Sequence, residues 1–146
     1  MHLLLRFSVA QPPARVVAGF TRQLFEALAP PFPKLHVRRF DGCRTGDTVN
    51  IELRAGPKRW QWDSLITDDG VLPDGTNYFV DEGQRVPAPL RQWRHRHLIT
   101  PSPSGGSVIV EDITYSTGRR WLDVVIYPAM WAQFRLRGPV YQRWFK

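Results

Sequence analysis

The chain has 146 residues, of which 42% are hydrophobic and 12% aromatic, and it carries a formal net charge of +7. This composition excludes a disordered chain, and the length fits one soluble domain, residues 1–146, that can bury a core without disulfides or metals. A single cysteine, Cys43, excludes an internal disulfide and a cysteine-based metal site, and favours a reducing compartment, which we expect to be the cytoplasm.

The basic charge is spread along the whole chain, with arginines from Arg6 to Arg143 and no dense basic run. No nucleic-acid-binding motif accompanies it, so we expect a solvated basic surface and no nucleic-acid partner. A weak contact with an anionic membrane surface stays open. The apolar run at residues 3–5 is too short for a membrane span, so no transmembrane segment is expected.

The first elements are a strand and a helix pair. Residues 3–9 are apolar enough for a strand, which Pro12-Pro13 ends. Apolar residues then recur at three- and four-residue steps up to Leu28, as on one face of a helix, with a break expected near Gly19. Pro30-Pro31 should end the second helix because proline cannot continue it.

From Lys34 onward the hydrophobic period changes to two, which predicts strands separated by turns. We expect about six strands here, at residues 35–40, 49–54, 59–66, 78–80, 92–99 and 108–115. Residues 68–75 are expected to be irregular, and Gly83 and Pro87-Ala88-Pro89 are expected to interrupt the chain again.

The C-terminal segment returns to helical spacing through Trp131, Phe134, Tyr141 and Phe145. Pro128 fits the first turn of this helix, where its missing N–H is harmless. Gly138-Pro139 falls within the apolar stripe and should bend the helix without ending it. The predicted class is therefore α+β: a curved antiparallel sheet of six to seven strands around a long C-terminal helix, with two short helices after the first strand.

Six segments resemble one known superfamily in sequence and in order. They are Val9-Ala10-Gln11-Pro12, Leu28-Ala29-Pro30-Pro31, residues 79–84 with Trp93-Arg94-His95-Arg96-His97, Asp112-Ile113-Thr114-Tyr115, and Phe134-Arg135-Leu136-Arg137. Together they resemble the START-like or Bet v 1-like (SRPBCC) ligand-binding proteins, in a bacterial branch with a WxHxH strand motif. The resemblance spans nearly the whole chain.

The resemblance implies a helix-grip fold, in which a bent sheet holds a long helix and leaves a cavity between them. Members bind lipids, sterols, quinones, plant hormones or polyketides, and a minority catalyse cyclisation or dehydration. Fold alone does not choose among these activities. We expect a small hydrophobic molecule as the partner and no cofactor.

Trp93, His95 and His97 share one strand face because side chains alternate along a strand. If that face is concave, both imidazoles enter the cavity, where they could anchor a ligand or act as a general base. Alternatively, they pair with Asp81 or Asp112 on neighbouring strands for structural reasons. A zinc ion shared by the two histidines would need a carboxylate as third ligand, and we expect no metal.

Other candidate ligand-binding residues are aromatic side chains that could converge on the cavity, and two carboxylates in otherwise apolar strands. A buried carboxylate needs partners, so the histidines and arginines are its natural neighbours. The full candidate set is Trp60, Trp62, Phe79, Asp81, Trp93, His95, His97, Asp112, Tyr115, Tyr127, Trp131 and Phe134.

Three functions remain open at this point. The first is non-enzymatic binding of a small hydrophobic molecule, such as a lipid, a quinone or a polyketide-like compound. The second is an enzyme of the polyketide cyclase or dehydratase type, with His95 or His97 as general base. The third is a membrane-surface or protein-interaction domain that uses the arginine-rich exterior.

Overall fold

The computed structural model describes all 146 residues and contains seven strands and four helices. In chain order these are β1 (His2–Val9), α1 (Pro13–Ala18), α2 (Arg22–Ala27), β2 (Lys34–Phe40), β3 (Thr48–Ala55), β4 (Lys58–Val71), β5 (Asn77–Arg85), β6 (Gln92–Pro101), β7 (Ser107–Ser116), α3 (Arg120–Arg135) and α4 (Arg137–Trp144). The predicted strand, helix pair, six strands and terminal helix are confirmed in this order.

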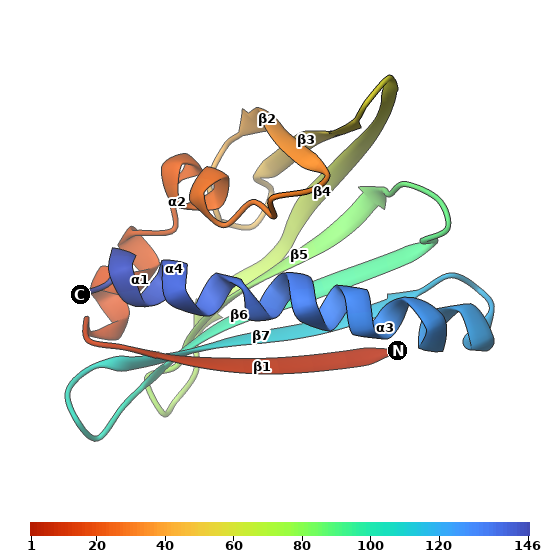
Figure 1. The fold of residues 1–146 in the computed structure, drawn as a ribbon. Helices are drawn as coiled ribbons and strands as arrows, with labels where there is room; N and C mark the ends of the chain where they lie inside the picture. The colour runs from red at the N-terminus through yellow and green to blue at the C-terminus, as the bar shows by residue number, and fades with distance from the viewer.

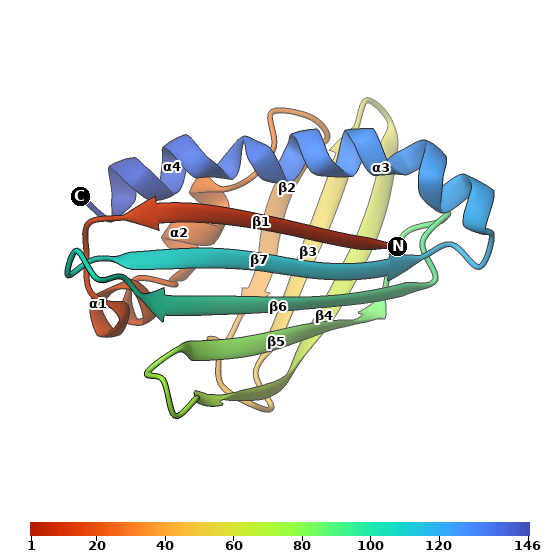
Figure 2. The ribbon, with the colours of Figure 1, turned by 90° about the horizontal axis from the view of Figure 1, so that it is seen from below.

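The strands form one antiparallel sheet in the order β1-β7-β6-β5-β4-β3-β2. The sheet curls, so that β2–β4 run at a steep angle to β5–β7 (Figure 1; Figure 2). The helices α3 and α4 lie along the concave side and form one long, bent C-terminal arm. The fold is a helix grip, as the sequence predicts.

Alternation of side chains decides which residues the concave face buries. Every second residue of β1, from Leu3 to Val9, is buried, while the residues between them are solvent-exposed. In β6 the same rule buries Trp93, His95, His97 and Ile99. Two histidines thus occupy positions that the pattern of a half-buried strand reserves for apolar residues.

The C-terminal helix begins earlier than the sequence predicts. It starts at Arg120, so Pro128 lies inside α3 and not in its first turn. Buried Asp123 fixes the early start, because its carboxylate accepts the backbone N–H of Thr117 at 2.7 Å. The division between α3 and α4 falls at Leu136, just before Gly138-Pro139, which agrees with the predicted bend.

Two predicted interruptions are only partly correct: the chain does turn at Pro73-Asp74-Gly75 and at Pro87-Ala88-Pro89, but the strands before these turns are longer than expected. β4 continues through Asp68–Gly70 to Val71, and β5 continues through Gly83 to Arg85. The β4–β5 ladder contains two register shifts, at Ile66/Asp68 and at Asp63/Ser64. They let both strands continue past these polar and glycine residues. Glycine is required at Gly83, because a Cβ there would lie 2.5 Å from Val86 and 3.1 Å from Trp93.

The main core lies between the concave face and the helices and contains 17 buried residues, from Leu3 of β1 to Phe145 beyond α4. A smaller cluster of Val37, Val49 and Ile51 lies under α2 in the β2–β3 lobe. No helix is both long enough and apolar enough to span a membrane. Between these two cores, the concave face of the sheet carries polar side chains.

Candidate functional site

Four ionisable side chains meet on the concave face at the centre of the sheet. They come from adjacent strands: Asp81 from β5, His95 and His97 from β6, and Glu111 from β7. The register places Asp81 opposite His95, and His97 opposite Glu111. Because directly opposed residues point to the same face, the sheet alone brings the four together.

The C-terminal helix supplies the other half of the cluster. Phe134, Arg137 and Tyr141 follow one another at helical spacing and face the sheet. The guanidinium of Arg137 lies 4.1 Å from the centre of the Phe134 ring and donates to Glu111 Oε1 at 3.2 Å. The ring and the carboxylate together fix the position of this arginine.

Glu111 is the centre of the cluster and is fully buried. Its carboxylate accepts hydrogen bonds from the Tyr141 hydroxyl, from Arg137 and from Nε2 of His95. Burial alone would raise the pKa of Glu111, but Arg137, followed by the two histidines, outweighs it and holds the pKa well below its usual range. Glu111 is therefore ionised and fully bonded.

The same environment keeps Tyr141 and Arg137 protonated. Burial, with the Glu111 charge next, raises the pKa of Tyr141 well above its ordinary value, so its hydroxyl remains a donor. Burial opposes the charge of Arg137, but the Glu111 carboxylate more than compensates and raises the pKa of Arg137. Glu111, Arg137 and Tyr141 therefore form one ion-paired and hydrogen-bonded unit.

Three residues of the cluster have a polar atom without a hydrogen-bond partner. These buried atoms are Asp81 Oδ1, His97 Nδ1 and Arg137 Nε. His97 Nδ1 lies 3.5 Å from Glu111 Oε2, but it makes no hydrogen bond to it. Burial raises the pKa of Asp81, and burial together with neighbouring His95 lowers the pKa of His97 well below its ordinary value. Buried orphan groups of this kind are uncommon in folded proteins.

A cavity of about 130 Å³ lies next to these groups, between the sheet and α3. Its inner wall is aromatic: the Trp93 ring meets Trp62 edge-to-face at 4.9 Å and packs against Phe134 at 5.9 Å. Polar groups lie on one part of the wall, and apolar groups cover most of the rest. Its lining includes Trp62, Ser64, Asp81, Trp93, His95, His97, Phe134 and Arg137.

The mouth of the cavity lies between α3 and the β2–β3 lobe. Met130 and Gln133 line it from the helix, and Pro30, Pro33 and Leu35 line it from the other side. All five are half-buried, whereas Trp93, His95 and His97 deeper inside are buried. The helical residues Met130, Gln133, Phe134 and Arg137 therefore form one stripe from the mouth to the polar cluster.

A second, smaller pocket of about 30 Å³ lies on the other side of the polar cluster. Five residues line both spaces: Phe25, Val49, Asp81, His97 and Arg137. The Phe79 ring stacks on His97 at 4.3 Å and belongs to this smaller pocket. The polar cluster is thus a partition between two interior spaces.

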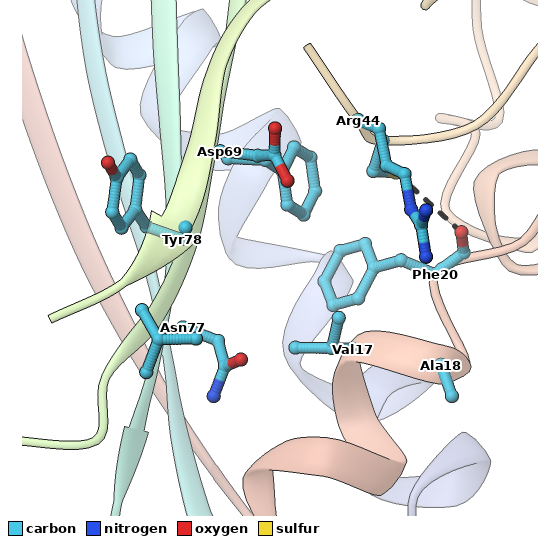
Figure 3. Close-up of a pocket in the computed structure, with 11 residues that line it drawn as sticks. Val17, Ala18, Phe20, Arg44, Asp69, Asn77 and Tyr78 are labelled. Atoms are coloured by element: carbon cyan, nitrogen blue, oxygen red, sulfur yellow. Dashed lines mark hydrogen bonds between the residues drawn. The ribbon is translucent and has the colours of Figure 1, made fainter.

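A larger groove of about 470 Å³ lies outside the grip (Figure 3). Figure 3 shows Val17 and Phe20 on one side and Asn77 and Tyr78 on the strand opposite. Within it, Asp69 accepts from the backbone N–H and hydroxyl of Thr45, and none of the buried unpaired polar atoms belongs to its lining. We therefore take the inner cavity, with its orphan polar atoms, as the candidate site.

The predicted site residues fall into two groups. Trp62, Asp81, Trp93, His95, His97 and Phe134 line the inner cavity, and Phe79 lies just behind His97. The others lie elsewhere: Trp60 is half-buried on β4 outside the cavity lining, Tyr115 is buried under α3, Tyr127 packs on the main core, and Trp131 is solvent-exposed.

Asp112 is also away from the cavity. It contacts His2 at 2.8 Å and Arg96 at 3.5 Å, both of which lie on the outer face of the sheet. The structural alternative for the histidines, a carboxylate from a neighbouring strand, is realised by Glu111 in place of Asp112. Glu111 and not Asp112 faces the histidines because side chains alternate along β7. Ile109, Glu111, Ile113 and Tyr115 share the buried face, and Asp112 points to the other side.

Sequence reasoning missed Glu111, Arg137 and Tyr141 as members of the site. The alternation of β7 contained the signal for Glu111, since buried Ile109 and Ile113 flank it at two-residue steps. For Arg137, the signal was its place one turn beyond Phe134 on the buried stripe. Tyr141 was recognised only as part of an apolar stripe.

Comparison with known proteins gives matches of structure alone. No family model and no curated protein sequence matches the chain. Protein Ms6760 from Mycobacterium smegmatis has a TM-score of 0.61 at 17% identity, over 95% of this chain and 88% of that one. Truncated norcoclaurine synthase from Thalictrum flavum has a TM-score of 0.63 at 10% identity, over 92% and 88%.

A third similar structure is the Zhui aromatase/cyclase from Streptomyces sp. R1128, with a TM-score of 0.55 at 14% identity, over 92% of this chain and 89% of that one. At these identities the likeness establishes the fold and not the activity. The chain has the Bet v 1-like helix-grip fold, as its sequence resemblance implies. The assignment to the WxHxH branch stays a prediction.

Proposed function

We propose that this protein binds a small, largely apolar molecule in the inner cavity, with a polar group of that molecule directed at Asp81, His97 and Arg137. The observation that carries the proposal is an aromatic-walled cavity with unpaired polar atoms at one end. Ligand sites typically combine apolar walls with a few polar groups that fix orientation. The fold supports the same function, since ligand-binding proteins are common in it.

The size of the cavity narrows the class of ligand. A dry cavity of about 150 Å³ binds a benzene-sized molecule, whereas drug-sized ligands need roughly 300–1,000 Å³. A space of about 130 Å³ therefore fits one substituted ring and not a sterol or a long acyl chain.

The polar end fits a hydroxyl or carbonyl group. Arg137 Nε is a donor without a partner, and Asp81 Oδ1 is a buried oxygen without one. A phenol hydroxyl can accept from Arg137 and donate to Asp81, whereas a quinone carbonyl can only accept from Arg137; each pairing removes part of the cost of leaving buried polar atoms unsatisfied. The neighbouring Trp62 and Trp93 rings suit the flat face of such a molecule.

Tryptophan fluorescence provides the test, because Trp62 and Trp93 line the cavity. Titration with a panel of single-ring phenols and quinones should change the emission and saturate. Gln133→Phe places a ring at the mouth and should abolish the effect. Ala132→Phe adds the same ring one residue away on the exposed side of the helix, and should leave binding unchanged.

Two outcomes would count against the proposal. One is the absence of saturable binding by any member of the panel to the folded protein. The other is equal binding by the Gln133→Phe and Ala132→Phe variants, since the ligand would then lie outside the cavity. Melting curves of both variants verify that each remains folded.

A second candidate function is acid–base catalysis on the bound molecule. The observation in its favour is that His95 Nε2 contacts the buried Glu111 carboxylate, which orients the ring as in other histidine–carboxylate pairs. Two of the similar structures carry enzyme names, norcoclaurine synthase and aromatase/cyclase. His95→Ala should then lose turnover of a bound substrate while retaining at least part of its binding, whereas a pure binding protein shows no turnover to lose.

A further inference from the structure

We propose that Asp81, His95 and His97 bind one divalent transition-metal ion of the zinc class at the inner end of the cavity. This inference goes beyond the proposed binding of an apolar molecule, with which it shares Asp81 and His97. It concerns the polar wall of the cavity and does not depend on which molecule occupies the apolar part.

The geometry of the three side chains carries the proposal. One potential ligand atom from each of Asp81, His95 and His97 lies within 4.8 Å of the others. Zinc binds histidine nitrogen and carboxylate oxygen at about 2.0–2.2 Å, so three such atoms around one ion are about 3–4 Å apart. Small side-chain rotations are enough to close the set, because all three residues come from two directly paired strands.

Unsatisfied atoms point to the same place. Asp81 Oδ1 and His97 Nδ1 are buried without any hydrogen-bond partner, and His97 as a residue is only 6% exposed. A buried polar group without a partner costs about 1–3 kcal/mol. A bound cation would satisfy the carboxylate and an imidazole at once, which no protein donor in the cluster does.

Charge balance around the three residues is favourable to a cation. Arg137 is the only positive side chain in the cluster, and it is paired with Glu111 at 3.2 Å. The two charges offset each other, which leaves the carboxylate of Asp81 without a counter-ion. A divalent ion would provide it.

Glu111 completes the arrangement as an outer partner. It accepts a hydrogen bond from Nε2 of His95, which leaves Nδ1 of that ring as the nitrogen with a free lone pair. Metal-binding histidines commonly donate their second N–H to a carboxylate in this way, which fixes the ring and increases its basicity. Glu111 is held in turn by Tyr141 and Arg137.

Three protein ligands leave at least one coordination position open, as in catalytic and not in structural zinc sites. Asp81, His95 and His97 all line the 130 Å³ cavity, so the open position faces the space proposed for the ligand. An oxygen of a bound molecule, or a water, would complete the coordination. Two histidines and one carboxylate are also a ligand set that Fe²⁺ accepts.

Cobalt titration of chelator-treated protein tests the proposal. Co²⁺ should bind once per chain and produce visible ligand-field bands of low coordination number without a thiolate band, and Zn²⁺ should displace it. Asp81→Asn and His97→Ala should each weaken binding at least tenfold, because loss of outer partners alone costs about 10- to 100-fold. Glu111→Gln should fall within that outer-partner range.

The chain offers a matched control, since His2 and His36 are its only other histidines and both are exposed. His2→Ala/His36→Ala should bind Co²⁺ as tightly as the unaltered protein, and so should Cys43→Ser. Circular dichroism and melting curves show whether each variant is folded.

Three results would overturn the proposal: no cobalt spectrum from the folded protein, binding that survives in Asp81→Asn/His97→Ala, or binding lost in His2→Ala/His36→Ala. The last would assign the ion to the surface pair of His2 and Asp112. Retention of phenol or quinone binding by metal-free protein separates this test from that of the proposed function.

Discussion

At the scale of single residues, the dominant feature is a carboxylate with no exposed surface. Glu111 is ionised although it is buried, because one cation and two further donors surround it. Such a group stabilises the fold only while all its partners remain in place. Removal of its charge would leave Arg137 buried without a counter-ion.

Glu111→Gln keeps the shape of the side chain and removes its charge. Breaking a buried ion pair by loss of one partner typically costs about 3–5 kcal/mol, and we expect a loss of this order in the free energy of unfolding measured by urea titration. Glu52→Gln is the control, because Glu52 on β3 pairs with Arg38 and Arg54, which are both more exposed than Arg137. A Glu111→Gln variant as stable as Glu52→Gln would contradict this account of the cluster.

Cys43 gives a second prediction at this scale. Burial, with nearby carboxylates such as Asp47 adding to it, raises the pKa of its thiol from 9.0 to about 12. The thiolate fraction at pH 8 is then about a thousandfold lower than for an ordinary thiol, and the thiolate is the reactive form. Reaction with a disulfide reagent at pH 8 should therefore be far slower in the folded protein than in urea. Equal rates in the two states would show that Cys43 is accessible and ordinary.

At the scale of elements, strand periodicity carries most of the information that the sequence holds. The alternation in 92–99 predicts that Trp93, His95 and His97 share a face, and the structure buries all three. The same rule applied to β7 would have placed Glu111 inside and Asp112 outside. The sequence prediction favours Asp112 because it is a carboxylate in an otherwise apolar strand, and that criterion ignores its phase in the strand.

Other parts of the site depend on relations between elements, which periodicity does not contain. The β5–β6 register sets Asp81 opposite His95, and the neighbouring β4–β5 ladder contains two irregularities that side-chain alternation does not predict. Arg137 reaches Glu111 only because the helix lies across the sheet with that turn over β7. The early start of α3 depends on the contact between Asp123 and Thr117, a local bond that hydrophobic spacing does not reveal.

The C-terminal arm provides a prediction for an element. Gly138 lies in α4, and a Cβ there would approach the Phe7 ring to 2.9 Å. Alanine is the better helix former by about 1 kcal/mol, but overpacking a core costs about 1–3 kcal/mol. Gly138→Ala should therefore destabilise the protein in urea unfolding, despite the gain in helix propensity.

Phe7→Leu supplies the control for this helix contact. The buried Phe7 ring packs against Tyr141 at 5.7 Å, so it has little freedom to move away from a new methyl group. In the Phe7→Leu background the alanine should cost less, and the two changes should not be additive. Full additivity would mean that the glycine is not required by the close approach of the arm to β1.

At the scale of the whole molecule, the helix grip creates a space whose two walls come from opposite ends of the fold. The sheet contributes Asp81, His95, His97 and Glu111, α3 and α4 contribute the stripe from Met130 to Arg137, and the β2–β3 lobe lines the mouth. The lobe has its own small core of Val37, Val49 and Ile51. The size of the cavity is therefore set by how closely the lobe lies to the helix.

This arrangement predicts selection of ligands by size. A molecule that binds only the folded state stabilises it by about 2.7 kcal/mol at a hundredfold excess over its dissociation constant, which corresponds to a rise in melting temperature of about 5–10 °C for a chain of this length. Single-ring phenols or quinones should produce such a rise, because a cavity of about 130 Å³ accommodates one ring. Fused multi-ring compounds at the same concentration should produce little rise, since they fit only if the lobe moves away from α3.

Gln133→Phe should remove the rise in melting temperature for the small ligands, and Ala132→Phe should preserve it. A larger shift with the multi-ring compounds than with the single rings would show that the lobe opens, and that the closed cavity underestimates the space that the grip offers.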